Sequence, residues 1–320
     1  DLAPVSYLDV LPGQFPYTRG TKKTSNDWYI RQNISVTNPS QANKKALDVL
    51  QKGITSIGFE IEDTNSYTAQ DVAVLLENID LTAIETCFVI GRGKTGFLKL
   101  FVAYVQSKGY NTRKIEGSIN SDYIGNFVKK GAFCYDSQDV CENNITELVA
   151  IAKALPKFRV CEVHADYISN AGGSITQELA CALAIGAEYL TIATNKGIDA
   201  GTFAPKMKFN FSISNNYFLE IAKLRAARLL WAQVVKTYGP ACDCSAKMVA
   251  HCETGTFNKT VYDPYVNMLR TQTEAMSAVL GGADSITVMP FDAVFRQPGE
   301  FSERIARNQQ ILLKEESHFD

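Results

Sequence analysis

The sequence predicts an α/β protein that folds as a (β/α)8 barrel, or TIM barrel, with an extended N-terminal arm. Short β-rich runs alternate with longer amphipathic runs over residues 41–320, which predicts parallel strands joined by crossover helices. Eight strand candidates occur, the number that closes a barrel. No linker rich in Ser, Gly or Pro divides the 320 residues, and α/β barrels of this size are common as single domains.

Residues 1–40 are expected to form the arm. They include the run Leu-Pro-Gly-Gln-Phe-Pro-Tyr-Thr-Arg-Gly at residues 11–20. Prolines and glycines in such a run favour turns and extended chain over helix. The barrel domain is therefore placed at residues 41–320.

The strand candidates are short runs enriched in β-branched and aromatic residues and bounded by turn residues. In chain order they lie at residues 54–61, 86–91, 111–119, 158–167, 189–194, 209–214, 248–254 and 285–291. The rival fold is an open doubly wound sheet, which would place a Gly-rich turn after its first strand. Residues 60–65 read Glu-Ile-Glu-Asp-Thr-Asn, so the barrel is favoured.

The helices are expected from spacing and from start signals. Apolar residues recur at three-to-four spacing within residues 72–79, the pattern of a helix with one buried face. Thr68 with Asp71, and Ser174 with Gln177, resemble capping boxes at helix starts. Long helices are expected at residues 217–238, 261–281 and 301–317, the first ended by Gly-Pro.

Small and polar residues occupy several strand candidates where bulky branched side chains normally fill a barrel. These residues are Ser118, Thr191, Thr194, Asn210, Ser212, Ser214, Ser285 and Thr287. We expect them to line an open axis that can hold an extended ligand. The alternative is that they face the helices, but positions that face helices should be apolar.

Composition excludes several classes of partner. The formal net charge is −2 with both signs interspersed, so neither nucleic acid nor a membrane surface is indicated. Apolar runs such as residues 98–105 are shorter than the ~20 residues of a membrane span. The sequence starts without the basic and apolar regions of a signal peptide, and its eight cysteines contain no Cys-x-x-Cys pair. We therefore expect a cytoplasmic protein with reduced thiols.

Six segments resemble the methylmalonyl-CoA mutase family in order and spacing, and together they cover essentially the whole chain. They are Pro-Gly-x-Phe-Pro-Tyr-Thr-Arg-Gly (12–20), Trp-Tyr-Ile-Arg-Gln (28–32), Phe-Ala-Pro (203–205), Lys-Leu-Arg-Ala-Ala-Arg-Leu-Leu-Trp-Ala (223–232), Arg-Thr…Glu-Ala-Met (270–276) and Arg-Ile-Ala-Arg-Asn (304–308). The resemblance implies a barrel through whose axis coenzyme A threads. It also implies adenosylcobalamin over the C-terminal rim and radical isomerisation between succinyl-CoA and methylmalonyl-CoA.

The resemblance also implies which residues would bind substrate. Those that match the family's pattern or stand close to it are Tyr17, Thr18, Arg19, Arg31, Ser118, Asn120, Arg225, His251 and Glu253. No catalytic residue is assigned with them, because four positions depart from the family's pattern.

Asn33 stands where the family places a Tyr near the radical. Asp166 and Tyr167 replace its Tyr and catalytic His, and Lys130 replaces the Arg that grips the substrate carboxylate. Lys keeps the charge but loses the two-pronged geometry of Arg, and a Tyr of pKa ~10 is a much weaker acid than His. The resemblance therefore points to the small, non-catalytic (beta) subunit of a bacterial heterodimer, partnered by a catalytic large subunit.

The cofactor is not expected on this chain alone. The family holds cobalamin through Asp-x-His-x-x-Gly in a separate domain, and none of the three histidines here lies in that motif. We expect no cobalamin-binding domain in this chain, no metal site, and adenosylcobalamin in the complex through the partner subunit. Two alternatives stay open: an active acyl-CoA mutase of altered specificity, with Tyr167 as acid and a separate cobalamin-binding chain, or a regulatory barrel that binds acyl-CoA.

Five further patterns have competing interpretations. Cys242, Cys244, His251 and Cys252 could hold zinc, although their spacing matches no known closed site. The Gly-rich residues 91–96 lack phosphate-loop spacing and are better read as a loop that enters a helix.

Arg225 and Arg228, three apart on a predicted helix, could hold a loop or a ligand phosphate, or form a solvated face. Trp28 in the arm is interpreted as a packing anchor in preference to a stacking platform for a ligand. Glu253 and Asp166 could act as paired carboxylates if the strand register brings them together.

Overall fold

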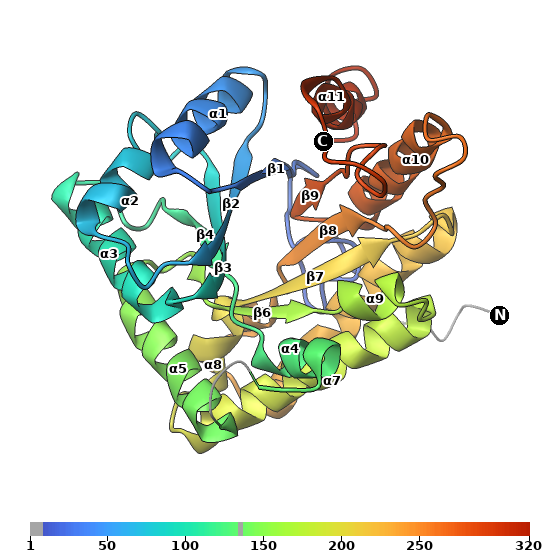
Figure 1. Cartoon of the computed structure of the whole chain (residues 1–320). Helices are drawn as coiled ribbons and strands as arrows, with labels where there is room; N and C mark the ends of the chain where they lie inside the picture. The colour runs from blue at the N-terminus through green and yellow to red at the C-terminus, as the bar shows by residue number, and fades with distance from the viewer. Residues whose placement is uncertain (1–8, 134–136) are drawn as a thin grey trace. The chain divides into compact units, whose positions relative to one another are not determined.

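The computed structural model describes residues 9–133 and 137–320 (Figure 1). Its elements fall into two compact units. The N-terminal unit contains the described residues of 29–162 together with 206–208, and the C-terminal unit contains residues 9–28, 163–205 and 209–320. None of the helices in this part of the chain is long and apolar enough to cross a membrane.

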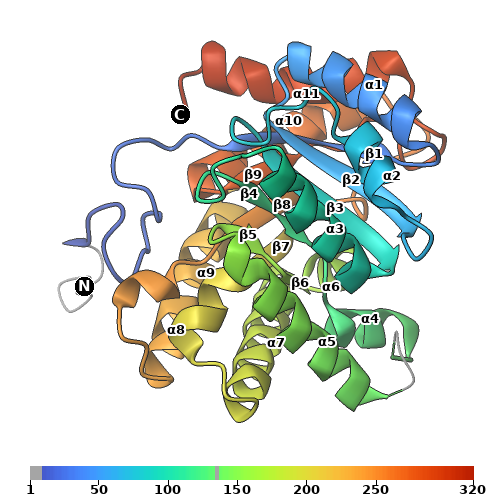
Figure 2. The ribbon, with the colours of Figure 1, turned by 90° about the vertical axis from the view of Figure 1, so that its left-hand side faces the viewer.

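The N-terminal unit is a parallel sheet covered by helices. Its strands are β1 (Tyr29–Ser35), β2 (Ser56–Asp63), β3 (Glu85–Arg92), β4 (Glu116–Ile119) and β5 (Phe158–Arg159), in the order β5-β4-β3-β2-β1. Its helices are α1 (Pro39–Gln51), α2 (Ala69–Leu75), α3 (Lys94–Ser107), α4 (Tyr123–Lys130), α5 (Gln138–Ile151) and the turn η2 (Ala152–Ala154). Figure 2 shows α1, α2 and α3 along one face of β1–β3.

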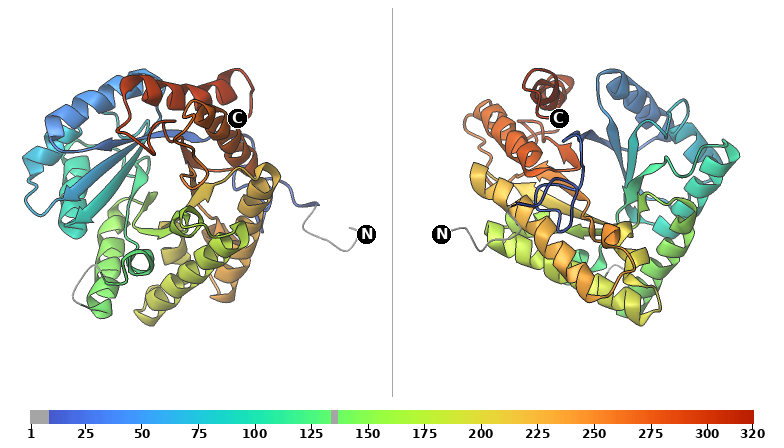
Figure 3. Two further views of the ribbon diagram at one scale, coloured as in Figure 1. Left: turned by 45° about the vertical axis from the view of Figure 1, so that its right-hand side comes forward. Right: turned by 180° about the vertical axis from the view of Figure 1, so that it is seen from behind.

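The C-terminal unit repeats the same organisation. Its strands are β6 (Cys161–His164), β7 (Met207–Ile213), β8 (Ala250–Thr254) and β9 (Ser285–Thr287), in the order β9-β8-β7-β6. The first two residues of β6 and of β7 belong to the N-terminal unit. Its helices are α6 (Asp166–Asn170), α7 (Ile175–Asn195), α8 (Ala200–Phe203), η3 (Ala204–Lys206), α9 (Tyr217–Thr237), η4 (Asp243–Ala246), α10 (Val266–Gly281) and α11 (Glu300–Glu315). Helices α7, α9 and α10 lie side by side (Figure 3).

The two faces of each strand differ in chemistry. Phe88 of β3 packs on Phe97 and Phe101 of α3, with ring centroids 4.8 and 5.0 Å apart. Phe209 of β7 packs on Trp231 of α9 at 4.7 Å. Because side chains alternate along a strand, the polar residues next to these aromatics face away from the helices. By register, the polar residues of β4, β7 and β9 lie on the face away from the helices, whereas Ser214 lies one residue past the end of β7. That they line an open axis stays a prediction.

Parallel strands followed by helices in both units confirm the predicted α/β barrel fold class. The strands predicted at 54–61, 86–91, 209–214, 248–254 and 285–291 match β2, β3, β7, β8 and β9. The strand predicted at 111–119 shortens to β4, and the one at 158–167 divides into β5 and β6 before α6 begins. Both predicted capping boxes, at Thr68 and Ser174, are present.

The strand predicted at 189–194 is wrong, because these residues lie inside α7. Its β-branched threonines misled the prediction. Thr191 and Thr194 donate their hydroxyls to the carbonyls of Ala187 and Leu190, at 3.1 and 2.9 Å, which is how Thr is accommodated in a helix. They therefore line no strand.

Strand β1 was not predicted. It lies within residues 1–40, and the prolines and glycines of residues 11–20 led to the expectation of an arm without strands. The count of eight thus included one false strand and omitted one real strand.

Candidate functional site

Polar side chains form two rows across the inner face of β7, β8 and β9. Asn210, His251 and Ser285 occupy one register row. The next row, toward the carboxyl ends of the strands, holds Ser212, Glu253 and Thr287. In α/β barrels the functional groups collect at this end of the strands. These rows are therefore the base of the candidate site in the C-terminal unit.

His251 is fixed by two hydroxyl groups. Its Nδ1 lies 2.8 Å from Ser285 Oγ and its Nε2 lies 3.3 Å from Thr287 Oγ1. Only 4% of the residue is exposed. A neutral imidazole can donate to one hydroxyl and accept from the other, so the ring is held in one orientation. Its predicted role in binding substrate stays a prediction.

A second histidine, which the sequence reasoning missed, lies at the end of β6. His164 Nδ1 is 3.1 Å from Asp166 Oδ1, and both side chains are more than four-fifths buried. The ring of Tyr167 stacks on His164 with centroids 5.0 Å apart and planes 7° apart. Asn210 Nδ2 lies 3.4 Å from Nε2 of the same ring. An imidazole hydrogen-bonded to a carboxylate is an arrangement that can hold or transfer a proton.

The signal for this cluster was present in the sequence: a His at a strand end, followed two residues later by Asp. The sequence patterns relate Asp166 to Glu253 and Tyr167 to an acid role, and neither pattern points to His164. The proposed pairing of Asp166 with Glu253 stays a prediction.

A cavity of about 390 Å³ opens at the end of β7. It is bordered by the end of α6, the start of α7 and the loop after β8. Among the described residues that line it none is charged, and its polar groups include Asn170, Ser212 and Asn216. Asn170 Oδ1 accepts hydrogen bonds from the amide and the hydroxyl of Thr256, at 2.9 and 3.0 Å. This bond ties α6 to the loop after β8.

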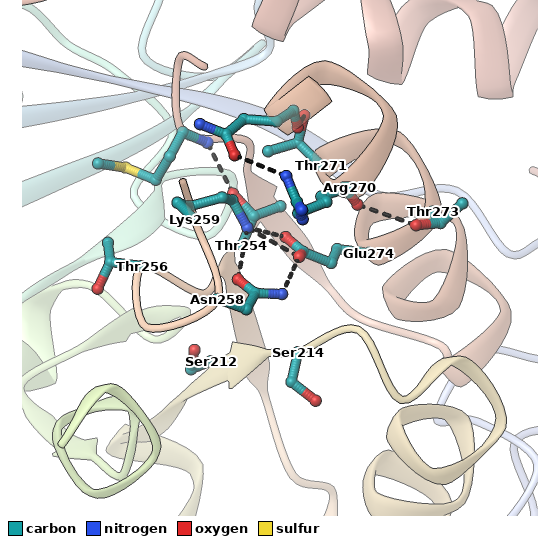
Figure 4. A network of polar contacts seen from close by, with 12 residues as sticks. Ser212, Ser214, Thr254, Thr256, Asn258, Lys259, Arg270, Thr271, Thr273 and Glu274 are labelled. Atoms are coloured by element: carbon teal, nitrogen blue, oxygen red, sulfur yellow. Dashed lines mark hydrogen bonds and ion pairs between the residues drawn. The ribbon is translucent and has the colours of Figure 1, made fainter. Parts of the chain in front are cut away.

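The loop after β8 is anchored to α10 by a buried ion pair. Figure 4 shows Lys259 and Asn258 directed at the carboxylate of Glu274. Lys259 Nζ lies 2.7 Å from each carboxylate oxygen, and Asn258 Nδ2 donates to one of them at 2.7 Å. Burial raises the pKa of Glu274 and lowers that of Lys259, against the attraction between the two charges.

The end of β7 is fixed by a second buried cluster. Lys223 Nζ lies 2.5 Å from Glu178 and 2.6 Å from Glu220, and all three side chains are fully buried. The backbone amides of Ser212 and Ser214 donate to Glu178 and Glu220, at 2.7 and 2.9 Å. Burial raises the pKa of Glu178 to about 7, although the charge of Lys223 opposes it. Burial lowers the pKa of Lys223, but the two carboxylates outweigh it and the pKa is raised.

The predicted substrate residues of the arm meet α9. The guanidinium of Arg228 donates to the carbonyls of Tyr17 and Thr18, at 3.1 and 3.4 Å. It also donates to the carbonyls of Gly281 and Gly282 at the end of α10, at 2.6 and 3.2 Å. The interpretation that this arginine pair holds a loop is thus confirmed for Arg228.

Arg19 and Arg225 are exposed, and their binding roles stay predictions. Trp28 is 3% exposed and donates its Nε1–H to Gln310 at 3.2 Å. This confirms Trp28 as the packing anchor of the arm.

In the N-terminal unit Arg31, Asn33 and Asn120 have hydrogen-bond partners within the fold. Arg31 Nε donates to Asn33 Oδ1 at 3.0 Å, and both lie against Gly58, where a Cβ would clash with them. Asn120 Oδ1 accepts from the amide of Ile90 at 2.6 Å. Lys130 is exposed in the last turn of α4.

Ser118 borders a buried lysine. Lys208 Nζ donates to Ser118 Oγ at 3.3 Å and lies 3.7 Å from a carboxylate oxygen of Glu85. Glu85 also accepts from Ser56 at 2.6 Å. Burial would raise the pKa of Glu85, but Lys208 and Arg31 hold it below its ordinary value. A charge pair therefore crosses the face of β3 and β4 that lies opposite the helices.

The cysteine pattern differs from expectation at one place. Cys242 and Cys244 form a disulfide, so the prediction of reduced thiols is wrong for this pair. Cys252 is fully buried, and burial raises its thiol pKa.

In residues 9–133 and 137–320, no group of three or more His, Cys, Asp and Glu side chains could hold a metal ion. The Gly-rich residues 91–96 lead into α3, with Gly93 at φ 81° as its N-cap.

Comparison with known proteins places these features in a family. A sequence model described as Methylmalonyl-CoA mutase matches residues 2–66 and 62–320. The chain is 45% identical to the "Methylmalonyl-CoA mutase small subunit" of Porphyromonas gingivalis, over all of this chain and 51% of that protein. It is 32% identical to the "Methylmalonyl-CoA mutase" of Cereibacter sphaeroides, over 99% and 48%. It is 29% identical to the "Methylmalonyl-CoA mutase large subunit" of Streptomyces virginiae, over 99% and 46%. The chain thus spans about half the length of these relatives.

Proposed function

The chain belongs to the methylmalonyl-CoA mutase family, and we propose that it is the barrel of a small subunit of such an enzyme. In this proposal the chain supports a catalytic large subunit and does not catalyse the reaction itself. The complex would interconvert succinyl-CoA and methylmalonyl-CoA. The identity of 45% to a small subunit, against 29% to a large subunit, supports the assignment.

The observation that carries the proposal is the buried position of Lys208. This residue is fully buried and contacts Ser118, one of the side chains expected to line a path for coenzyme A. It also pairs with Glu85. Separating a buried pair leaves an uncompensated charge, which costs about 3–5 kcal/mol. An extended acyl-CoA would have to displace this pair, so Lys208 argues against binding along the inner face of these strands.

The residues at the family's reacting positions support the same proposal. Isomerisation needs a general acid close to the thioester carbonyl and a tightly held substrate carboxylate. Tyr167 stacks on His164 and is a weak acid, and Asn33 accepts from Arg31. Lys130 is exposed at the end of α4 and offers no two-pronged contact.

Adenosylcobalamin would be held by the partner subunit. In the complex, this cofactor would supply the radical that starts the rearrangement. Two histidines of this chain do not fit as residues that would hold the cofactor: His251 is 4% exposed between two hydroxyls, and His164 is engaged with Asp166 and Tyr167. His318 is exposed but lies outside any Asp-x-His-x-x-Gly motif.

The partner and the location are parts of the same proposal. Residues 1–40 would provide the arm for subunit contact or substrate entry, and residues 41–320 would form the barrel. Strand β1 (Tyr29–Ser35) would join the barrel from within the arm, because it pairs with β2. The printed names of the relatives, small subunit and large subunit, support a heterodimer. A cytoplasmic location is supported by free thiols at Cys87, Cys141, Cys161, Cys181 and Cys252, to which the Cys242–Cys244 disulfide is an exception.

One observation favours the alternative of an active mutase of altered specificity. The pair His164–Asp166 lies at the end of β6 and could supply the proton donor that Tyr167 cannot. In that case a separate chain would bind cobalamin. The third possibility is a regulatory barrel that binds acyl-CoA without turnover.

Calorimetry with succinyl-CoA tests these possibilities on the isolated chain. We expect no binding heat at micromolar concentrations, because Lys208 and Glu85 occupy the inner face. A catalytic relative, such as the Cereibacter sphaeroides mutase, serves as the positive control. Binding in the micromolar range would contradict the argument from Lys208 and support the regulatory barrel.

A further inference from the structure

An exposed disulfide lies directly beneath the docked arm. Cys242 and Cys244 are both exposed and are joined across a single residue. The bond closes a small ring that contains the backbone of Asp243. The turn η4 starts at Asp243 and continues into Ser245 and Ala246, which are only 7% and 1% exposed. The disulfide ring is thus exposed to solvent, while the residues that follow it are buried in the fold.

The arm rests on the carbonyl group inside this ring. The hydroxyl of Tyr17 donates to the backbone oxygen of Asp243 at 2.9 Å. Tyr17 is 4% exposed, and Lys247, just after η4, lies 5.7 Å from the centre of its ring. Burial raises the pKa of Tyr17, with a smaller contribution from Asp243. The phenol therefore remains a donor at neutral pH.

The arm conformation at this point depends on outside contacts. Tyr17 has φ 64°, a left-handed conformation that costs of order 1 kcal/mol for a non-glycine residue and persists only where its surroundings impose it. The surroundings here are the guanidinium of Arg228, which binds the Tyr17 carbonyl, and the carbonyl of Asp243, which binds its hydroxyl. One of these two supports is part of the disulfide ring.

We propose that Cys242 and Cys244 form a thiol-exchangeable site whose oxidised state holds the arm at Tyr17 and whose reduced state releases it. The partner in the exchange is a low-molecular-weight thiol of the glutathione class. Exposed disulfides are the ones open to such exchange. This inference goes beyond the proposed function and does not depend on it.

The exchange balances in two steps. A thiolate attacks one sulfur of the disulfide, forms a mixed disulfide with that cysteine and expels the other as a thiolate. A second thiol then attacks the mixed disulfide, releases a small-molecule disulfide and frees the remaining cysteine. Two thiols are oxidised to one disulfide, and the two cysteines take up the two electrons and two protons. The ring opens, and the Asp243 carbonyl loses its covalent restraint.

Hydrogen exchange of the purified protein measures the effect on the arm. The reporting amides are those of Gly13, Tyr17 and Gly20, which bond to carbonyls within the arm at 2.9, 2.7 and 3.0 Å. After reduction we expect these amides to exchange roughly 5- to 10-fold faster, the effect of weakening about one hydrogen bond. Amides in the middle of α7 should not change, which separates arm release from general unfolding.

Three variants sharpen the test. The double variant Cys242→Ser/Cys244→Ser should show fast arm exchange with and without reductant. Tyr17→Phe removes the hydroxyl and should also abolish the response to reductant. Cys181→Ser, which removes a half-buried free thiol elsewhere, should respond like the unaltered protein. Equal arm exchange in the oxidised and reduced protein would overturn the proposal. So would peptide mapping that finds Cys242 and Cys244 unpaired after treatment with oxidised glutathione.

Discussion

Replacement of Lys223 by methionine is expected to lower the free energy of unfolding by about 3–5 kcal/mol, the cost of removing one partner from a buried ion cluster. Lys223 is fully buried and is the shared cation of Glu178 and Glu220. Without it, two carboxylates remain in a site closed to water. They also hold the backbone at Ser212 and Ser214, so the end of β7 should loosen. Urea denaturation monitored by circular dichroism measures the loss.

The free energy of unfolding of the Lys223→Met variant should also depend on pH differently from that of the unaltered protein. The folded-state pKa of Glu178 is raised from 4.5 to about 7, so between these values the folded chain binds more protons than the unfolded chain. Stability from this group is therefore present below pH 4.5 and is lost as pH rises toward 7. Lys223 opposes this rise, so its removal raises the pKa of Glu178 further, and the loss of unfolding free energy should be larger at pH 8 than at pH 5.

A deficit in Lys223→Met that is independent of pH would contradict the charge argument for this cluster. Arg225→Met is the matched control, because Arg225 is an exposed cation on the same helix. Its unfolding free energy should stay within about 0.5 kcal/mol of the unaltered protein.

Replacement of Arg228 by methionine is expected to lower the free energy of unfolding by about 3 kcal/mol. Each buried carbonyl group that loses its hydrogen-bond donor costs about 1–3 kcal/mol, and water that enters the site offsets part of this loss. Its guanidinium joins the arm at Tyr17 to the last residue of α10, Gly281. Burial lowers the pKa of Arg228 to about 10, with Asp284 opposing, so it remains charged at neutral pH. Thermal and urea unfolding measure the loss, and tryptic cleavage at the exposed Arg19 reports release of the arm.

Arg228→Lys separates charge from geometry. Lysine keeps the positive charge but cannot reach carbonyls on both sides with one planar group. We expect it to recover less than half of the stability lost in Arg228→Met. Full recovery by lysine would mean that the charge alone, and not the shared hydrogen bonds, holds the arm.

The fold class could be predicted because alternation of strand and helix is a long-range pattern that survives local errors. The errors came where local composition misleads. Residues 189–194 combine tyrosine and threonine in an apolar run, but the helix that starts at Ser174 continues through them. Strand β1 follows a stretch of prolines and glycines, yet Ile30 and Ile34 are buried in it. The strand propensity of individual residues is a weak guide where tertiary packing determines the secondary structure of a segment.

The candidate site was predictable in its residue types and less so in its partners. Sequence could place Asn210, Ser212 and Thr287 on strands, and period-2 alternation gave the face that they share. It could not show that Lys208 reaches across to Glu85 and Ser118, because that contact joins residues about 90 to 120 positions apart. Nor could it distinguish Arg228, which binds the arm, from the exposed Arg225 three residues earlier.

Reconstitution with a candidate large subunit tests the account most directly. The rate of conversion of succinyl-CoA in the presence of adenosylcobalamin is measured for this chain, for the large subunit and for the two together. We predict no turnover by this chain alone, a stable complex of the two, and turnover only where the large subunit is present. Conversion by this chain with only a detached cobalamin-binding domain would contradict the account.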